Sequence, residues 1–260
     1  MQGESRTTKI LLRLIGEEKR KEIDNFASES SNRLFYEIKN QNQLTQLFKN
    51  ITMQFKDHLT FDDLMIIRSY TGYQFKNINA ILRNNWSYEE CGLLTDEIKN
   101  KYQKLAQEIE RLVNKFPSLE MDVSTYRGVE LNSLKKYGIK NLKELEILKD
   151  KYMYEEGFTS TSIIRNNSYF GQNLENSKNY NIEIKYLIPK ESKDGALLIE
   201  DNLSFSPGQT EYLINKGSLA KIIDVKINIE TNQAQLTALL IPKKLWNINE
   251  KKEIEKREYK

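Results

Sequence analysis

Apolar residues recur at helical spacing through the first part of the chain. From about residue 17 to 116, long charged stretches carry an apolar residue every three to four positions. This spacing collects the apolar side chains on one face of a helix. The clearest example runs through Ile98, Tyr102, Leu105, Ile109 and Leu112. Thr95 is a suitable N-cap for this helix, and Phe116-Pro117 a suitable end. The first part of the chain is therefore predicted to be helical.

From about residue 122 onward, apolar and polar residues alternate with the period of two that is typical of strands. The stretch between the first two strands, residues 141–152, predicts a helix instead. The predicted strands cover residues 123–127, 157–162, 181–189, 196–200, 210–214, 219–229 and 233–241, and we expect the last two to pair through a turn at residues 230–232. Helices followed by a mostly antiparallel sheet make an α+β fold.

Composition excludes several kinds of protein. The 260 residues and 38% hydrophobic content suffice for a proper core. Lys and Arg number 40 against 37 Asp and Glu, a balance that does not argue for a nucleic acid or an acidic membrane as partner. Cys91 is the single cysteine and His58 the single histidine, so we expect neither a disulfide framework nor a metal site. The N-terminal apolar patch is interrupted by Arg13, so we predict neither a signal peptide nor a membrane span.

Two of the predicted strands carry groups suited to chemistry. Arg127 ends the first strand just before Gly128, where a guanidinium fork could bind phosphate and the missing side chain would let a ligand approach the backbone. Ser160 and Ser162 lie on one face of the second strand. Taken singly, an arginine at a strand end and a serine-rich edge strand are more often structural or simply exposed.

Two further segments carry candidate groups. Asn79 and Arg83 stand four residues apart on a predicted helix, where an amide and a guanidinium on one face could bind a diphosphate. Gly208 precedes Gln209 and Glu211, which share one face of a predicted strand. A surface helix face and a surface turn are the ordinary alternatives for these two segments.

Together, the order and spacing of these segments resemble the Arg–Ser–Glu class of bacterial mono-ADP-ribosyltransferase toxins. Within that class they are most similar to the Rho-modifying exoenzymes. The resemblance covers roughly residues 45–243. The motifs are Tyr126-Arg127-Gly128, Ser160-Thr161-Ser162 and Gln209-Thr210-Glu211, supported by Tyr70-Thr71-Gly72 and by residues 78–83. The sister class, which uses His-Tyr-Glu, does not fit because the first-strand position carries Arg127.

The resemblance implies a fold and a division of the chain. The fold is N-terminal helices packed on a mostly antiparallel β core of two sheets. Residues 1–44 are then an N-terminal helical extension, residues 45–243 the ADP-ribosyltransferase catalytic domain, and residues 244–260 a charged C-terminal tail.

The resemblance also implies that NAD is the substrate, with no metal involved, and that the bond between nicotinamide and ribose is cleaved. Glu211 would face the developing sugar cation, Ser160 would hold the Glu211 carboxylate, and Arg127 beside Gly128 would bind the diphosphate. Asn79 and Arg83 would assist Arg127.

Three more residues receive roles from the resemblance. Phe170 would pack on nicotinamide, although Gln172 stands where relatives often have an arginine. Gln209 resembles the exoenzymes that modify asparagine, because an amide can hydrogen-bond a carboxamide but cannot activate a guanidinium. Phe205 would dock the acceptor protein.

The resemblance thus predicts a monomeric virulence factor that is secreted and acts in the host cytosol on a Rho-type small GTPase, without a stable nucleic-acid partner. Three alternatives stay open from the sequence. One is an NAD glycohydrolase, in which water takes the ribosyl group. Another is an enzyme that modifies a guanine base. The third is a binding module that kept only the fold.

Overall fold

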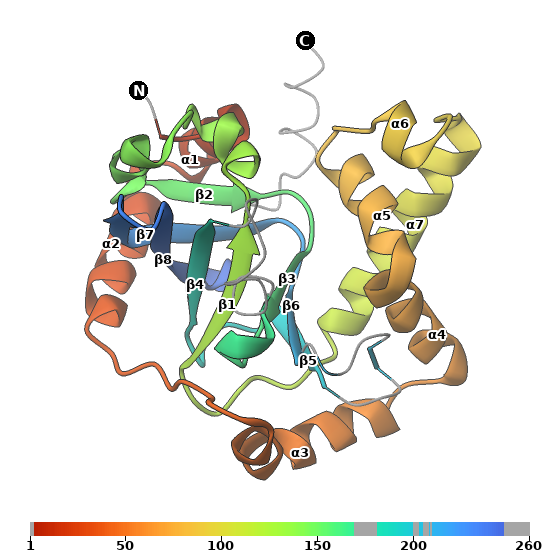
Figure 1. The fold of residues 1–260 in the computed structure, drawn as a ribbon. Coiled ribbons are helices and arrows are strands. Elements are labelled where there is room, and N and C mark those ends of the chain that lie inside the picture. Colours follow the sequence, from red (N-terminus) through yellow and green to blue (C-terminus); the bar gives the residue numbers. More distant parts are fainter. Residues whose placement is uncertain (1–2, 169–180, 200–202, 205–207, 209, 247–260) are drawn as a thin grey trace.

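The computed structural model describes residues 3–168, 181–199, 203–204, 208 and 210–246, and it is an α+β protein as the sequence predicts. Most helices precede the sheet in the chain (Figure 1). They are α1 (Arg6–Ile15), α2 (Glu17–Ser31), α3 (Gln41–Asp57), α4 (Phe61–Ser69), the π-helical turn η1 (Tyr70–Gln74), α5 (Phe75–Leu82), α6 (Tyr88–Cys91) and α7 (Asp96–Val113). Three 3-10 segments and one short helix follow, namely η2 (Leu131–Tyr137), η3 (Leu142–Leu148), η4 (Arg165–Asn167) and α9 (Lys243–Trp246).

Helix ends agree with the capping signals in the sequence. Thr95 caps α7, and its side chain accepts a hydrogen bond from the amide of Ile98. The helix ends at Val113, slightly before the predicted stop at Phe116-Pro117. The first helix, α1, starts earlier than the predicted helical region and is capped by Ser5.

All seven predicted strands are present, together with one that was not predicted. The strands are β1 (Val123–Val129), β2 (Tyr152–Glu155), β3 (Thr159–Ser162), β4 (Ile182–Ile188), β5 (Gly195–Leu198), β6 (Glu211–Ile214), β7 (Ser218–Asn228) and β8 (Gln233–Ile241). Their order is β2-β7-β8-β4-β1-β3-β6-β5, and every neighbouring pair is antiparallel except β4 and β8. The predicted hairpin of β7 and β8 is confirmed.

The helix predicted over residues 141–152 is wrong in its second half. Leu142, Leu145 and Leu148 recur every three residues, which is the period of the 3-10 helix that forms there. The helix ends at Leu148, and the residues from Tyr152 onward pair as β2 with β7. Pairing with a distant strand overrides the local pattern here.

The eight strands form one hydrogen-bonded sheet, where the sequence suggested two. The two halves meet between β1 and β3, where only Tyr126 and Ser162 are in register. By contrast, β1 and β4 pair along their full length. The sheet is therefore continuous but narrowly joined at the place where the motif-bearing strands meet.

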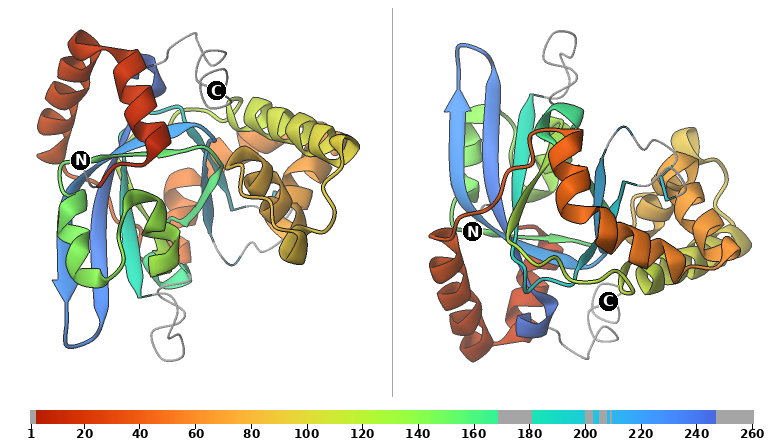
Figure 2. Two further views of the ribbon diagram at one scale, coloured as in Figure 1. Left: turned by 90° about the horizontal axis from the view of Figure 1, so that it is seen from above. Right: turned by 90° about the horizontal axis from the view of Figure 1, so that it is seen from below.

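The core has three parts. Helices α3, α4, α5 and α7 pack against β5 and β6, and η2 and η3 cover β4, β7 and β8. Apolar residues of α1 and α2 pack on Leu187, Leu219, Leu239 and Ile241, so the N-terminal helices are fixed to the sheet. Figure 2 shows α1 and α2 at one end of the molecule and helices α4 to α7 at the other. Within the described residues, no helix is long and apolar enough to cross a membrane.

Candidate active site

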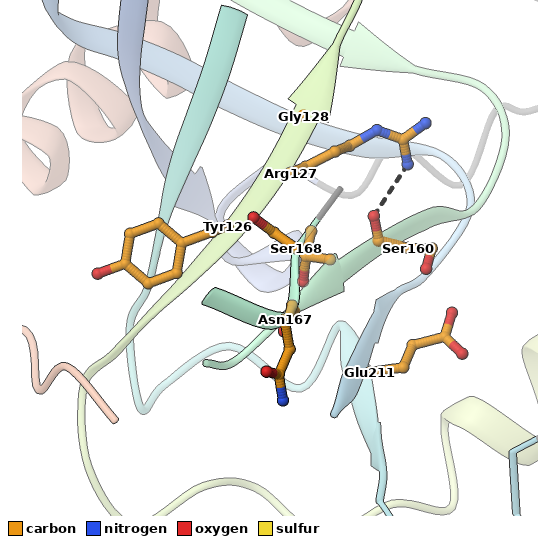
Figure 3. Close-up of a pocket in the computed structure, with 9 residues that line it drawn as sticks. Tyr126, Arg127, Gly128, Ser160, Asn167, Ser168 and Glu211 are labelled. Carbon is orange, nitrogen blue, oxygen red and sulfur yellow. Dashed lines mark hydrogen bonds between the residues drawn. The ribbon is translucent and has the colours of Figure 1, made fainter. Parts of the chain in front are cut away.

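Strand pairing brings three of the sequence motifs to one place. Ser162 of β3 is in register with Tyr126 of β1 on one side and with Glu211 of β6 on the other. The residues of this row and their neighbours line a pocket of about 30 Å³ that is open to solvent (Figure 3). The lining residues are Tyr126, Arg127, Gly128, Ser160, Thr161, Ser162, Asn167, Ser168 and Glu211. Of the predicted site residues, the structure thus gathers Arg127, Gly128, Ser160 and Glu211.

Arg127 extends from β1 toward β3. One terminal nitrogen of its guanidinium donates a hydrogen bond to the backbone carbonyl of Ser160 at 3.0 Å (Figure 3). Within the described part of the chain this is its one hydrogen bond, while a guanidinium carries five N–H donors. The bond fixes the side chain at the pocket wall and leaves donors for a ligand.

Glu211 is the buried acid of the pocket, with only 5% of its surface exposed. Ser160 pairs with Leu213, two residues beyond Glu211, so the side chains of Ser160 and Glu211 are diagonal neighbours on one face. Burial raises the pKa of Glu211 from its ordinary 4.5 to about 7, although the nearby Ser160 hydroxyl and the charge of Arg127 both lower it. Such a displaced pKa in a pocket is typical of functional carboxylates.

The backbone just before Glu211 is held in an unusual conformation. Thr210 has a φ of +50°, which is rare for a β-branched residue. Three contacts hold it there. The Thr210 hydroxyl lies 2.8 Å from the Ser162 hydroxyl and 3.4 Å from the side-chain nitrogen Nδ2 of Asn167. The backbone amide of Ile163 donates to the backbone carbonyl of Thr210 at 3.0 Å. These contacts fix the direction in which Glu211 leaves the backbone.

Asn79 and Arg83 lie on one face of the α5 helix end, as their spacing predicts, but neither lines the pocket. Both contact Phe158, the residue before β3. The Asn79 side-chain oxygen accepts from the Phe158 amide at 2.9 Å, and Arg83 donates to the Phe158 carbonyl at 3.3 Å. Arg83 also donates to Glu155 at 2.7 Å. They tie the helical region to the strand that carries Ser160, and their predicted contact with NAD stays a prediction.

Three predicted site residues, Phe170, Phe205 and Gln209, lie outside the described residues. Conversely, the sequence analysis gave no role to Asn167, Ser168 and Thr210, which line the pocket or contact its lining. Thr210 is the middle residue of the Gln-Thr-Glu motif, so its position was marked in the sequence, but its backbone conformation was not. In the described part of the chain, no three Asp, Glu, His or Cys side chains gather as metal ligands.

The sequence matches the family model described as "ADP-ribosyltransferase exoenzyme" over residues 45–243. The chain belongs to this family. It is therefore an ADP-ribosyltransferase of the exoenzyme type, as the sequence motifs predict. A search of curated protein sequences finds no significant match.

Solved structures of C3-type exoenzymes share the fold. C3stau2 from S. aureus, solved with NAD, is 19% identical with a TM-score of 0.63, covering 81% of this chain and 100% of its own. The C3 exoenzyme of Clostridium limosum is 21% identical with a TM-score of 0.60, covering 80% and 98%. A C3 ADP-ribosyltransferase from Clostridium botulinum is 22% identical with a TM-score of 0.61, covering 80% and 99%.

We predict that Gly157→Ala destabilises the protein. A Cβ at residue 157 would stand 2.6 Å from the side-chain oxygen of Asn79 and 3.0 Å from Nε of Arg83, both of which are held by hydrogen bonds. Overpacking of this kind costs about 1–3 kcal/mol in the free energy of unfolding, measurable by urea denaturation. Gly208→Ala is the control, since its added Cβ meets nothing within 4 Å among the described residues outside its chain neighbours. Equal stability of the two variants would contradict the prediction.

We also predict that Glu211→Gln stabilises the protein in a pH-dependent way. Because the folded pKa, about 7, lies above the ordinary 4.5, the folded state binds the proton more tightly. The wild type therefore loses stability as pH rises from about 4.5 to 7, by on the order of 3 kcal/mol. Glutamine carries no such penalty.

The free energy of unfolding of Glu211→Gln and wild type should accordingly converge toward pH 5 and separate above pH 7. Urea titrations between pH 5 and 8.5 measure the difference. Glu230→Gln at the exposed β7–β8 turn is the control, and we expect no pH-dependent gain from it. A constant difference between Glu211→Gln and wild type would show that Glu211 is not the titrating group.

Proposed function

We propose that the protein is a mono-ADP-ribosyltransferase toxin that transfers ADP-ribose from NAD to an asparagine of a host Rho-type small GTPase and releases nicotinamide. One observation carries the proposal. Three strands bring Arg127, Ser160 and the buried Glu211 to the same pocket, although the motifs are widely separated in the sequence. A scaffold without catalytic function needs no such combination of guanidinium, hydroxyl and buried carboxylate.

Glu211 is the proposed catalytic residue. Breaking the bond between nicotinamide and ribose leaves positive charge on the sugar, as in glycoside cleavage. A carboxylate in a buried site stabilises that charge strongly, because no water screens it. The nearby Ser160 hydroxyl and the Arg127 charge favour the ionised form of Glu211 and so oppose the effect of burial. A pKa of about 7 means that a substantial fraction is ionised at neutral pH.

Arg127 is the proposed anchor for the diphosphate of NAD. Its fork of donors matches phosphate oxygens, and one of its N–H groups is already fixed on the Ser160 carbonyl at 3.0 Å. Gly128, next in the strand, adds no side chain to the pocket wall. Asn79 and Arg83 support the strand from the helical side, and Phe170 is the proposed packing partner of nicotinamide. Positioning of this kind lowers the entropy cost of reaching the reactive geometry.

Gln209 and Phe205 are the proposed acceptor contacts. An amide can donate to and accept from the carboxamide of an asparagine, which supports an asparagine acceptor. The C3 exoenzymes that share the fold support a Rho-type target, which implies secretion and action in the host cytosol. The N-terminal extension over residues 1–44 and the catalytic domain over residues 45–243 form part of the same proposal.

Incubation with labelled NAD and a mammalian cell lysate tests the proposal. We expect one labelled protein band, and mass spectrometry should place ADP-ribose on an asparagine of a Rho-type GTPase. Glu211→Gln should label nothing. Free ADP-ribose without a labelled protein would favour an NAD glycohydrolase instead, and label in the nucleic-acid fraction would favour a guanine base as acceptor.

We predict that Gln209→Ala separates transfer from hydrolysis. The variant should keep its rate of NAD hydrolysis, because the pocket that holds Arg127, Ser160 and Glu211 is unchanged, but lose about tenfold or more in transfer to the acceptor. Release of nicotinamide and labelling of the acceptor are measured in parallel. Gln107→Ala, on the exposed surface of α7, is the control and should keep both rates. If Gln209→Ala kept its transfer rate, the proposed acceptor contact would be wrong.

A further inference from the structure

A second, strongly basic concavity lies between α1 and η2, away from the Glu211 pocket. It encloses about 700 Å³ and shares no lining residue with that pocket. Five cationic side chains line it, opposed by the single carboxylate of Glu4. They are Arg6, Lys9 and Arg13 on α1 and Lys135 and Lys136 on η2. We call this concavity the basic groove.

The helical period explains why the α1 cations face one way. Arg6, Lys9 and Arg13 are spaced by three and four residues and so form a stripe along the helix. The other face of α1 buries Leu11, Leu12 and Ile15 against the sheet. Since α1 is fixed by its apolar face, its basic stripe cannot turn away from the groove.

The opposite wall is the last turn of η2, which carries Lys135 and Lys136. The amide of Gly3 donates to the carbonyl of Tyr137 at 3.2 Å and so ties the start of the chain to this turn. Figure 1 shows α1 beside the green helical turns that follow β1. Cations from two separate elements therefore face the same space.

The groove gathers five cationic side chains and one carboxylate, whereas the whole chain has a net charge of only +3. Lys136 forms ion pairs with Glu155 at 3.6 Å and Glu156 at 3.3 Å. Within the described residues, Arg6, Arg13 and Lys135 form no ion pair. A concave wall of one charge sign focuses the electrostatic field and attracts counter-ions. These cations repel one another, and an anion that binds in the groove relieves the repulsion.

We propose that the basic groove binds a compact anion that carries several phosphate groups, either a free polyphosphorylated small molecule or the same head group on a lipid. The volume lies within the range of about 300–1,000 Å³ that is usual for small-molecule sites. Arginine forks pair with phosphate in a bidentate way, and lysines add point charges. Cations on two walls suit phosphates that point in more than one direction, which an extended nucleic-acid strand or a flat bilayer surface does not offer.

Calorimetry with inositol hexakisphosphate at about 0.15 M salt tests the proposal, because exposed long-range charge effects are largely screened there. The test variant is Arg6→Gln/Arg13→Gln/Lys135→Gln. The control variant, Lys39→Gln/Lys49→Gln/Lys99→Gln, removes the same charge at exposed positions outside the groove. We expect the test variant to bind about tenfold or more weakly, and the control within about twofold of wild type.

Neither variant should melt at a lower temperature than the wild type, and both should keep its rate of NAD hydrolysis, because the substituted side chains of the test variant line neither the core nor the Glu211 pocket. Equal loss of binding in both variants, or none in the test variant, would overturn the proposal.

Three further probes identify the source of the phosphates. Vesicles of phosphatidylcholine with phosphatidylinositol bisphosphate report a lipid head group, and binding that depends on Arg6, Arg13 and Lys135 would show that the lipid-linked form is accepted. Binding of inositol hexakisphosphate alone would assign the groove to free ligands. Phosphatidylserine vesicles or a single-stranded DNA oligonucleotide that bound more tightly than inositol hexakisphosphate through the same residues would overturn the proposal.

Discussion

The free energy of burying the Glu211 carboxyl is the constraint on which the site depends. With 5% of its surface exposed, Glu211 would stay protonated near neutral pH if burial acted alone, and a protonated acid cannot stabilise a cation. Ser160 and Arg127 each lower its pKa, and they reach it from two other strands. The sheet therefore decides the chemistry, because only the pairing of β3 with both β1 and β6 brings a hydroxyl and a guanidinium to this carboxyl. The result is a pKa of about 7, where small changes in the surroundings shift the fraction that is ionised.

The narrow junction between β1 and β3 makes this arrangement dependent on outside support. Only Tyr126 and Ser162 are in register there, so the ladder itself offers little stiffness. Two groups of contacts support the junction from outside. Asn79 and Arg83 hold both backbone groups of Phe158 at the start of β3, and Arg83 is paired with Glu155. Although burial raises the pKa of Glu155, the charges of Arg83 and Lys136, together with hydrogen bonds from Arg83 and Gly157, lower it overall. At the other end of β3, Ser162 and Asn167 hold Thr210 in its left-handed conformation.

The sequence predicts those parts of the fold and site that depend on a local pattern. The periods of 3.6 and 2 locate the long helices and all seven predicted strands, and motif order identifies the family. What the sequence does not reveal depends on contacts between distant residues. The strand β2 exists because β7 offers it an edge, and the positive φ of Thr210 exists because three neighbours hold it. Asn79 and Arg83 were correctly placed on one face of a helix. Only the fold shows that this face meets Phe158, since the two segments lie more than seventy residues apart.

The basic groove depends in a similar way on how the N-terminal helices pack. Leu11, Leu12 and Ile15 fix α1 on the sheet, and the same docking sets its basic stripe opposite Lys135 and Lys136. Hydrophobic burial thus holds like charges close together, at a cost that the apolar contacts offset. Lys136 belongs to the groove and is also paired with Glu155, which binds Arg83, and Arg83 in turn contacts the residue before β3. The basic groove and the Glu211 pocket share no lining residue, yet a continuous chain of ion pairs and hydrogen bonds runs from one toward the other. An anion that drew Lys136 away from Glu155 would leave Arg83 as the main partner of that carboxylate and so strengthen the contact that supports β3.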